Sequence, residues 1–130
     1  MAIEEVIKTK ISAASGITDI VGVRHYWLKP PQGFTLPMLV WQLSGRARGR
    51  ETTGLNAKDR STFQVDCVAE TITGARDLAD AVITALDGNT GTTSGIKVQQ
   101  FAIRDESDVY DFETDLLSRT LIFEVAYVTA

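Results

Sequence analysis

The stretch that most constrains this chain is residues 71–88, TITGARDLADAVITALDG, which has the apolar spacing of one amphipathic helix. Thr71 is placed to act as the N-cap, and Gly88 stands where the end of a helix commonly adopts the left-handed conformation. The residues at three- and four-residue spacing are Ile72, Ala75, Leu78, Ala79, Val82, Ile83 and Leu86. A helix with such a face must pack on a large apolar surface, and the flanking strands are the only such surface available.

Alternation of apolar and polar residues predicts four long strands around this helix, over 38–44, 61–69, 96–104 and 116–128. In the third of them, Ile96 and Val98 share one face of the strand. Phe101 and Ile103 have the opposite parity, so we expect a β-bulge at Gln99–Gln100, where one extra residue restores the face.

The N-terminal part of the chain predicts shorter elements. Residues 2–14 have the apolar stripe of a helix, 17–21 are interpreted as a single turn, and 24–28 as a short strand. The predicted order is α-β-β-β-α-β-β, in one domain over residues 1–130. We therefore expect an α+β fold, a mostly antiparallel sheet of four to five strands with two helices on one face.

The charged residues are distributed unevenly along the chain. Residues 45–60 hold five basic and two acidic residues, net +3, lack an apolar period, and are interpreted as a long, exposed, mobile arm. Residues 104–115 hold one basic and six acidic residues, net −5. Within them, 105–115 is predicted to be an acidic loop in which Tyr110 and Phe112 pack or form an interface. The arm and the loop are complementary between copies, head to tail, and such contacts close into rings.

Catalytic and metal-binding functions find little support in the sequence. The single cysteine, Cys67, has inward parity in a strand, and the single histidine, His25, has no nucleophile motif beside it. The acidic stretch 105–115 lacks the central glycine of a calcium loop. Two suitably placed carboxylates, as in glycoside hydrolysis, are the one catalytic arrangement left open. We therefore expect no enzyme activity, no cofactor and no metal.

Membrane and general nucleic-acid partners are also unexpected. No apolar run reaches the roughly 18–20 residues that span a bilayer, so we expect no membrane partner. The formal net charge of −4 argues against a general nucleic-acid binder, which normally carries a basic footprint.

Several segments, taken in order, carry a resemblance. The first group of matching segments is PMLVWQ over 37–42 and FQVDCVAETITGARDLADAVITALDG over 63–88. Residues 94–127 then give a strand, the pattern D-E-x-D-x-Y, and a long final strand opened by L-x-R. The positions that match are Asp105, Glu106, Asp108, Tyr110, Glu113, Leu117 and Arg119. The ordered set resembles the tail-completion, or tail-terminator, proteins of long-tailed bacteriophages and prophages, with departures at Ile72, Gly74 and 25–29.

This resemblance implies a structural virion protein, assembled in the cytoplasm of the bacterial host, and not an enzyme. It implies a homo-oligomeric ring, usually a hexamer, at the head-proximal end of the tail tube. The ring ends tube polymerisation and offers a joining surface to the head. The implied partners are further copies of the chain, the tail-tube protein, and the head connector or stopper protein. Genomic DNA passes through the lumen without specific binding.

We expect the contacts with these partners in segments 45–60 and 105–115. The candidate interface residues are Arg46, Arg48, Arg50, Lys58, Arg60, Asp105, Glu106, Asp108, Tyr110, Glu113 and Arg119. One alternative is a neck or connector ring on the head side of the joint. Another is a small nucleic-acid-binding accessory protein, in which Arg46, Arg48 and Arg50 contact phosphates.

Overall fold

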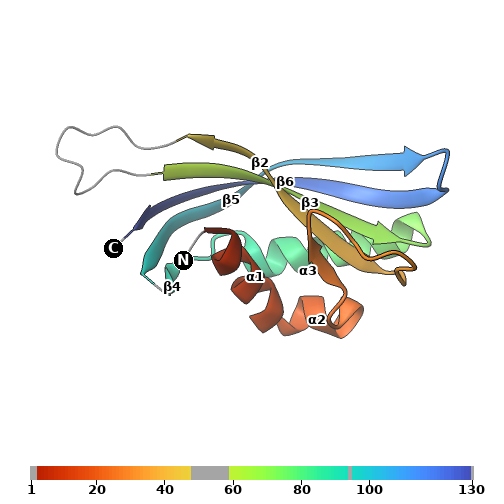
Figure 1. The fold of residues 1–130 in the computed structure, drawn as a ribbon, viewed down its shortest axis with the longest axis horizontal. Helices are drawn as coiled ribbons and strands as arrows, with labels where there is room; N and C mark the ends of the chain where they lie inside the picture. The colour runs from red at the N-terminus through yellow and green to blue at the C-terminus, as the bar shows by residue number, and fades with distance from the viewer. Residues whose placement is uncertain (1–2, 48–58, 94, 130) are drawn as a thin grey trace.

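The computed structural model describes residues 3–47, 59–93 and 95–129. Within them, three helices lie on one face of a curved, six-stranded sheet (Figure 1). The elements in chain order are α1 (Ile3–Ala13), α2 (Ser15–Val21), β1 (His25–Trp27), β2 (Met38–Ala47), β3 (Asp59–Ala69), α3 (Ile72–Leu86), β4 (Gly91–Thr93), β5 (Ile96–Asp111) and β6 (Leu116–Thr129). The α+β class is confirmed, whereas two helices and four to five strands were too few.

The central helix is confirmed as α3. The Thr71 hydroxyl accepts a hydrogen bond from the Gly74 backbone N at 3.0 Å, so Thr71 is the N-cap. After the helix ends, Gly88 has a φ of 77°, in the left-handed region that glycine adopts readily. The buried face consists of Ala75, Leu78, Ala79, Val82 and Leu86. Ile72 was wrongly placed on this face, because as the first residue of the helix it stays 42% exposed.

The two missed elements depend on contacts that sequence pattern does not reveal. α2 was predicted as a single turn over 17–21, but it is a helix that buries Ile17 and Val21 and ends at Gly22, whose φ is 60°. β4 was not predicted, and it lies in the polar segment 89–95, NTGTTSG, between the predicted helix and the strand predicted from residue 96. Its three residues have no apolar alternation and are held as a strand by pairing with Ile96–Val98 of β5.

The strand order in the sheet is β1-β2-β3-β6-β5-β4. The pairings among the four long strands are antiparallel, as predicted. β1 instead runs parallel to β2, with His25 opposite Leu39 and Trp27 opposite Trp41. The connection over 28–37 carries the chain back along the sheet, so both strands start from the same end.

One continuous core fills the space between the helices and the sheet. The largest buried side chains of the sheet are Trp41, Phe63, Phe101, Phe123 and Tyr127. The first two helices add Ile3, Ile7, Ile11 and Ile17. Phe101 packs edge-on against Phe123, with ring centroids 5.3 Å apart, an arrangement that aromatic pairs prefer. None of the described helices is long and apolar enough to cross a membrane.

The predicted arm is shorter than the sequence suggested. β2 continues to Ala47 and β3 starts at Asp59, with Ala47 opposite Arg60. Residues 45–47 and 59–60 are therefore strand, and the remaining 48–58 lie outside the described residues. The strand ends were missed because Gly, Arg and Asp give no apolar alternation, whereas ladder hydrogen bonds require no particular side chain.

The N-cap of α3 can be tested by mutation. Thr71→Ala should lower the free energy of unfolding by about 0.5–2 kcal/mol, because the Gly74 N–H loses its acceptor. Thr73→Ala is the matched control, since Thr73 is an exposed threonine within the same helix and alanine is the better helix former. Urea denaturation measures both variants. Equal stability of the two would show that the cap contributes nothing.

Candidate functional site

β5 and β6 form one long hairpin, and its far half carries the acidic residues. Pairing runs from Ile96 opposite Thr129 to Asp111 opposite Leu116. The predicted acidic loop over 105–115 is therefore wrong for 105–111, which are strand, and only 112–115 form the turn. Both faces of this half are exposed, so it lacks the alternation by which a strand is recognised. Figure 1 shows the hairpin reaching the end of the sheet opposite to the start of β3.

Two register shifts in β5 decide which side chains share a face. The first confirms the bulge predicted at Gln99–Gln100. The second lies between Ile103 and Asp105 and was missed, because no run of apolar residues follows it to reveal the change of parity. This second bulge sets the register in which Asp108 lies directly opposite Arg119.

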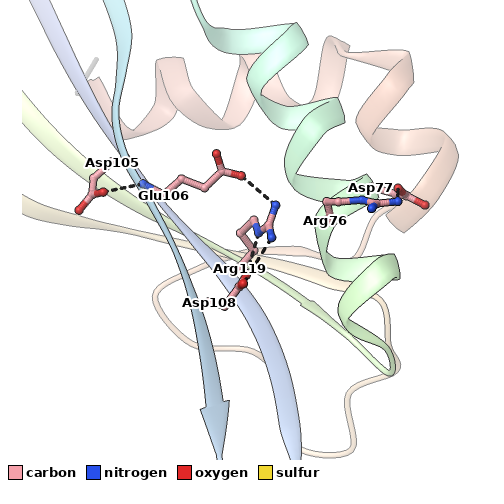
Figure 2. Close-up of polar contacts among 6 residues, drawn as sticks. All are labelled: Arg76, Asp77, Asp105, Glu106, Asp108 and Arg119. Carbon is pink, nitrogen blue, oxygen red and sulfur yellow. Dashed lines mark hydrogen bonds and ion pairs between the residues drawn. The ribbon is translucent and has the colours of Figure 1, made fainter.

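Arg119 is the centre of an ion-pair cluster on the hairpin, drawn in Figure 2. Its Nε donates to Asp108 Oδ1 at 2.8 Å, and its Nη1 donates to Glu106 Oε1 at 3.1 Å. These hydrogen bonds lower the pKa of Asp108 and raise that of Arg119. Three predicted interface residues thus meet within one chain, and the Arg119 side chain is only 20% exposed. The cluster fixes the two strands of the hairpin against each other.

The tip of the hairpin is aromatic as well as acidic. The rings of Tyr110 and Phe112 pack edge to face with centroids 4.7 Å apart. The Tyr110 hydroxyl donates to Asp115 Oδ1, which raises the pKa of Tyr110, and the turn closes with Asp115 at a φ of 59°. Phe112 is 86% exposed in spite of this order. Packing or an interface was predicted for both aromatics, but the candidate interface residues named from the sequence include Tyr110 and not Phe112.

Backbone N–H groups order two further acids of this segment, Asp105 and Asp111. Asp105 Oδ1 accepts from the Glu106 backbone N at 2.8 Å. Asp111 Oδ1 accepts from the Glu113 backbone N at 2.9 Å, and this hydrogen bond lowers the pKa of Asp111. The carboxylates of Asp105 and Asp111 are therefore held in a defined geometry before any partner binds.

The described part of the basic arm lies at the other end of the sheet. Arg46 is opposite Ser61 in the β2–β3 ladder, and Arg60 donates to Glu124 Oε1 at 3.0 Å. The other three predicted arm cations, Arg48, Arg50 and Lys58, lie outside the described residues. Leu116 of β6 lies at the acidic tip, and Ala126 of the same strand lies opposite Arg60. At about 3.3 Å per residue, the acidic tip and the arm are therefore about 33 Å apart along β6.

The residues considered for catalysis do not converge. Cys67 is fully buried, and burial raises the pKa of its thiol, so it is a core residue. His25 and Cys67 both pair with Leu39, from the two strands that flank β2, which places their backbones about 10 Å apart. His25 Nε2 instead lies 3.5 Å from Ser12 Oγ. Within the described residues, no group of three or more His, Cys, Asp or Glu side chains is arranged to hold a metal ion.

The Arg119 cluster predicts a titration change. Arg119→Met should raise the pKa of Asp108, because the hydrogen bond that stabilises the carboxylate is lost. NMR titration of the side-chain carboxyl group measures it, and Arg76→Met, which removes the contact with Asp77 on α3, is the control. In the wild-type protein the pKa of Asp108 is lower in the folded than in the unfolded state. The contribution of this carboxylate to the free energy of unfolding is therefore fully present above about pH 4 and is lost as the pH falls through the folded pKa. An unchanged Asp108 pKa would contradict the cluster.

The sequence and the fold of this chain were compared with those of known proteins. A search of curated proteins finds no match. Among solved structures, a chain in "Virion of native gene transfer agent (GTA) particle" has the same fold, with a TM-score of 0.75 and 18% sequence identity over 93% of this chain and 90% of that chain. The family model described as "Tail completion protein gp17" matches residues 5–128. The chain therefore belongs to the tail completion protein gp17 family, a family of structural phage tail proteins.

Proposed function

We propose that this protein forms a ring at the head-proximal end of a phage tail, where it ends tail-tube polymerisation and provides the surface to which the head joins. The observation that carries the proposal is the family match, which extends over residues 5–128 and so includes the core, the arm and the acidic hairpin. The similar fold of a chain in a gene transfer agent virion supports a place in an assembled particle.

The charge distribution supports an assembly of identical copies. The acidic tip and the start of the basic arm lie about 33 Å apart, at opposite ends of one sheet, and so do not neutralise each other within a chain. Contacts between two different surfaces of the same chain are heterologous, and they form a closed ring when the rotation between copies closes. A hexamer is the proposed size, with the tail-tube protein on one side of the ring and the head connector or stopper protein on the other.

The net charge also agrees with DNA passage. A chain with a formal net charge of −4 gives a ring with an excess of negative charge, which repels phosphate. We propose that genomic DNA crosses the lumen without specific binding, in the assembled virion. The protein needs no catalytic group for this function, and its work consists of binding other proteins.

Addition of the purified protein to polymerising tail tubes tests this function. Tubes should stop growing, and electron microscopy should show a ring at the tube end that faces the head, with particle mass measured in parallel. Tubes that grow at the same rate with and without the protein, and a protein that stays monomeric beside them, would refute the proposal. A ring found only on isolated heads would identify the head-side neck protein instead.

The nucleic-acid alternative has its own signature. Binding to duplex DNA that falls steeply as salt rises from about 50 to 200 mM would favour it. In that case, replacement of Arg46, Arg48 and Arg50 by serine should abolish the binding. Under the proposed function, we expect no such salt-dependent DNA binding by the wild-type protein.

A further inference from the structure

The edge of the sheet at β1 carries a basic and aromatic hollow that sequence analysis did not single out. It has a volume of about 210 Å³, and its lining residues are Lys8, His25, Tyr26, Trp27, Lys29 and Trp41. Two of the six, Lys8 and Lys29, are cationic and none is acidic, whereas an adjoining hollow that shares Lys8, Trp27 and Trp41 is also lined by Glu4 and Glu5. Residues 22–37, which form most of this edge, contain Arg24 and Lys29 but no Asp or Glu. The pKa of His25 is lowered by burial and by Lys8, so the positive charge of the hollow rests on its lysines.

The aromatic side of this hollow is ordered but incompletely covered. Trp27 stacks on Trp41 with ring centroids 5.6 Å apart and an interplanar angle of 1°. Trp41 is buried, whereas Trp27 is 56% exposed. The indole Nε1 of Trp41 is buried without a hydrogen-bond partner in the described part of the chain. The hollow therefore offers an aromatic wall and two cations, which suits an aromatic ring accompanied by carboxylates.

The tip of the β5–β6 hairpin has this chemistry. Phe112 is 86% exposed, and its position is fixed by the Tyr110 ring and by the Tyr110–Asp115 hydrogen bond. Asp111 and Glu113 flank Phe112 directly. A cavity of about 150 Å³ is enough to hold a benzene ring, so the hollow has room for one phenyl group. An anchor that is already ordered loses little entropy on binding.

The hairpin cannot supply this group to the hollow of its own chain. β1 is the first strand of the sheet order, whereas β5 lies on the far side of β2, β3 and β6. At about 4.8 Å between neighbouring strands, β1 and β5 are about 19 Å apart across the sheet. The register aligns His25 with Asp108 through Leu39, Cys67 and Arg119, so Phe112 lies a further four residues, or roughly 13 Å, along the strand direction. The contact therefore requires two molecules.

We propose that the hairpin tip of one copy docks in the β1 hollow of the next copy, with Phe112 against Trp27 and the flanking acids beside Lys8 and Lys29. This inference rests on the proposed assembly of identical copies, and it assigns the acidic tip to the β1 hollow of the next copy instead of to its basic arm. The contact links different surfaces of the two molecules, so it propagates around a ring. Phe112 is the anchor, and the charges set the orientation.

Cross-linking between two single-cysteine variants tests the contact. One protein carries Phe112→Cys and the other carries Gln32→Cys, an exposed position in the groove beside Tyr26 and Lys29. The native Cys67 is buried and does not compete for the reagent. After the two proteins are mixed and assembled on tail tubes, a short thiol-reactive cross-linker should give a covalent heterodimer. Lys97→Cys, on the exposed side of β5 beside β4, replaces Gln32→Cys in the control and should give none.

Substitution of the anchor gives an independent measurement. Phe112→Ser should weaken self-association on tubes by roughly tenfold or more, as expected for a central aromatic hot spot, whereas Phe112→Tyr should retain it. Val109→Ser is the matched control, since Val109 is 47% exposed on the same hairpin but lies outside the proposed contact. Far-UV circular dichroism of the variants confirms that they fold.

The outcomes separate this inference from the proposed function. If wild-type protein caps tubes, but the Phe112→Cys and Gln32→Cys pair does not cross-link and Phe112→Ser caps equally well, the docking is overturned and the function stands. Cross-linking of Phe112→Cys to the tail-tube protein instead would assign the hairpin to a different partner and also overturn it. If wild-type protein fails to cap, cross-linking in concentrated solution still decides whether the copies meet through these surfaces.

Discussion

The packing of the apolar face of α3 against the sheet is the interaction on which the other features depend. The large buried side chains of this face, Leu78, Val82 and Leu86, each contribute roughly 1.5–3 kcal/mol relative to an exposed position. α3 also connects β3 to the β4–β6 part of the sheet, so its position determines how these parts meet. With the core complete on the helix side, β5 and β6 can extend into solvent as an acidic hairpin.

The sheet separates charges that are also separate in sequence. Its topology places the acidic tip at one end and Arg46 and Arg60 at the other, while the basic β1 edge lies on the opposite side of the sheet from β5. A single molecule therefore presents unlike surfaces that do not reach each other. Such an arrangement favours head-to-tail association between copies.

The charged residues of the β5–β6 hairpin have two different roles. In its shaft, Arg119 is engaged by Glu106 and Asp108, and these three residues stabilise the pairing of β5 with β6. At its tip, Asp111 and Glu113 stand beside an exposed Phe112, where a partner can meet them. The tail completion pattern D-E-x-D-x-Y followed by L-x-R thus includes residues that hold the hairpin in shape, as well as residues at its surface.

The sequence by itself determined the α+β class, the extent and cap of α3, the four long strands and the first bulge of β5, because each depends on local periodicity or on the conformation of one residue. The resemblance to the tail completion family was also visible in the sequence. Only the tertiary structure decided the direction of β1, the presence of β4, the strand character of 105–111 and the pairing of Arg119 with Asp108. The hollow around Trp27 and Lys29 likewise combines residues from α1, β1 and β2. These features depend on hydrogen bonds and contacts between distant segments, and such contacts leave no periodic signal in the chain.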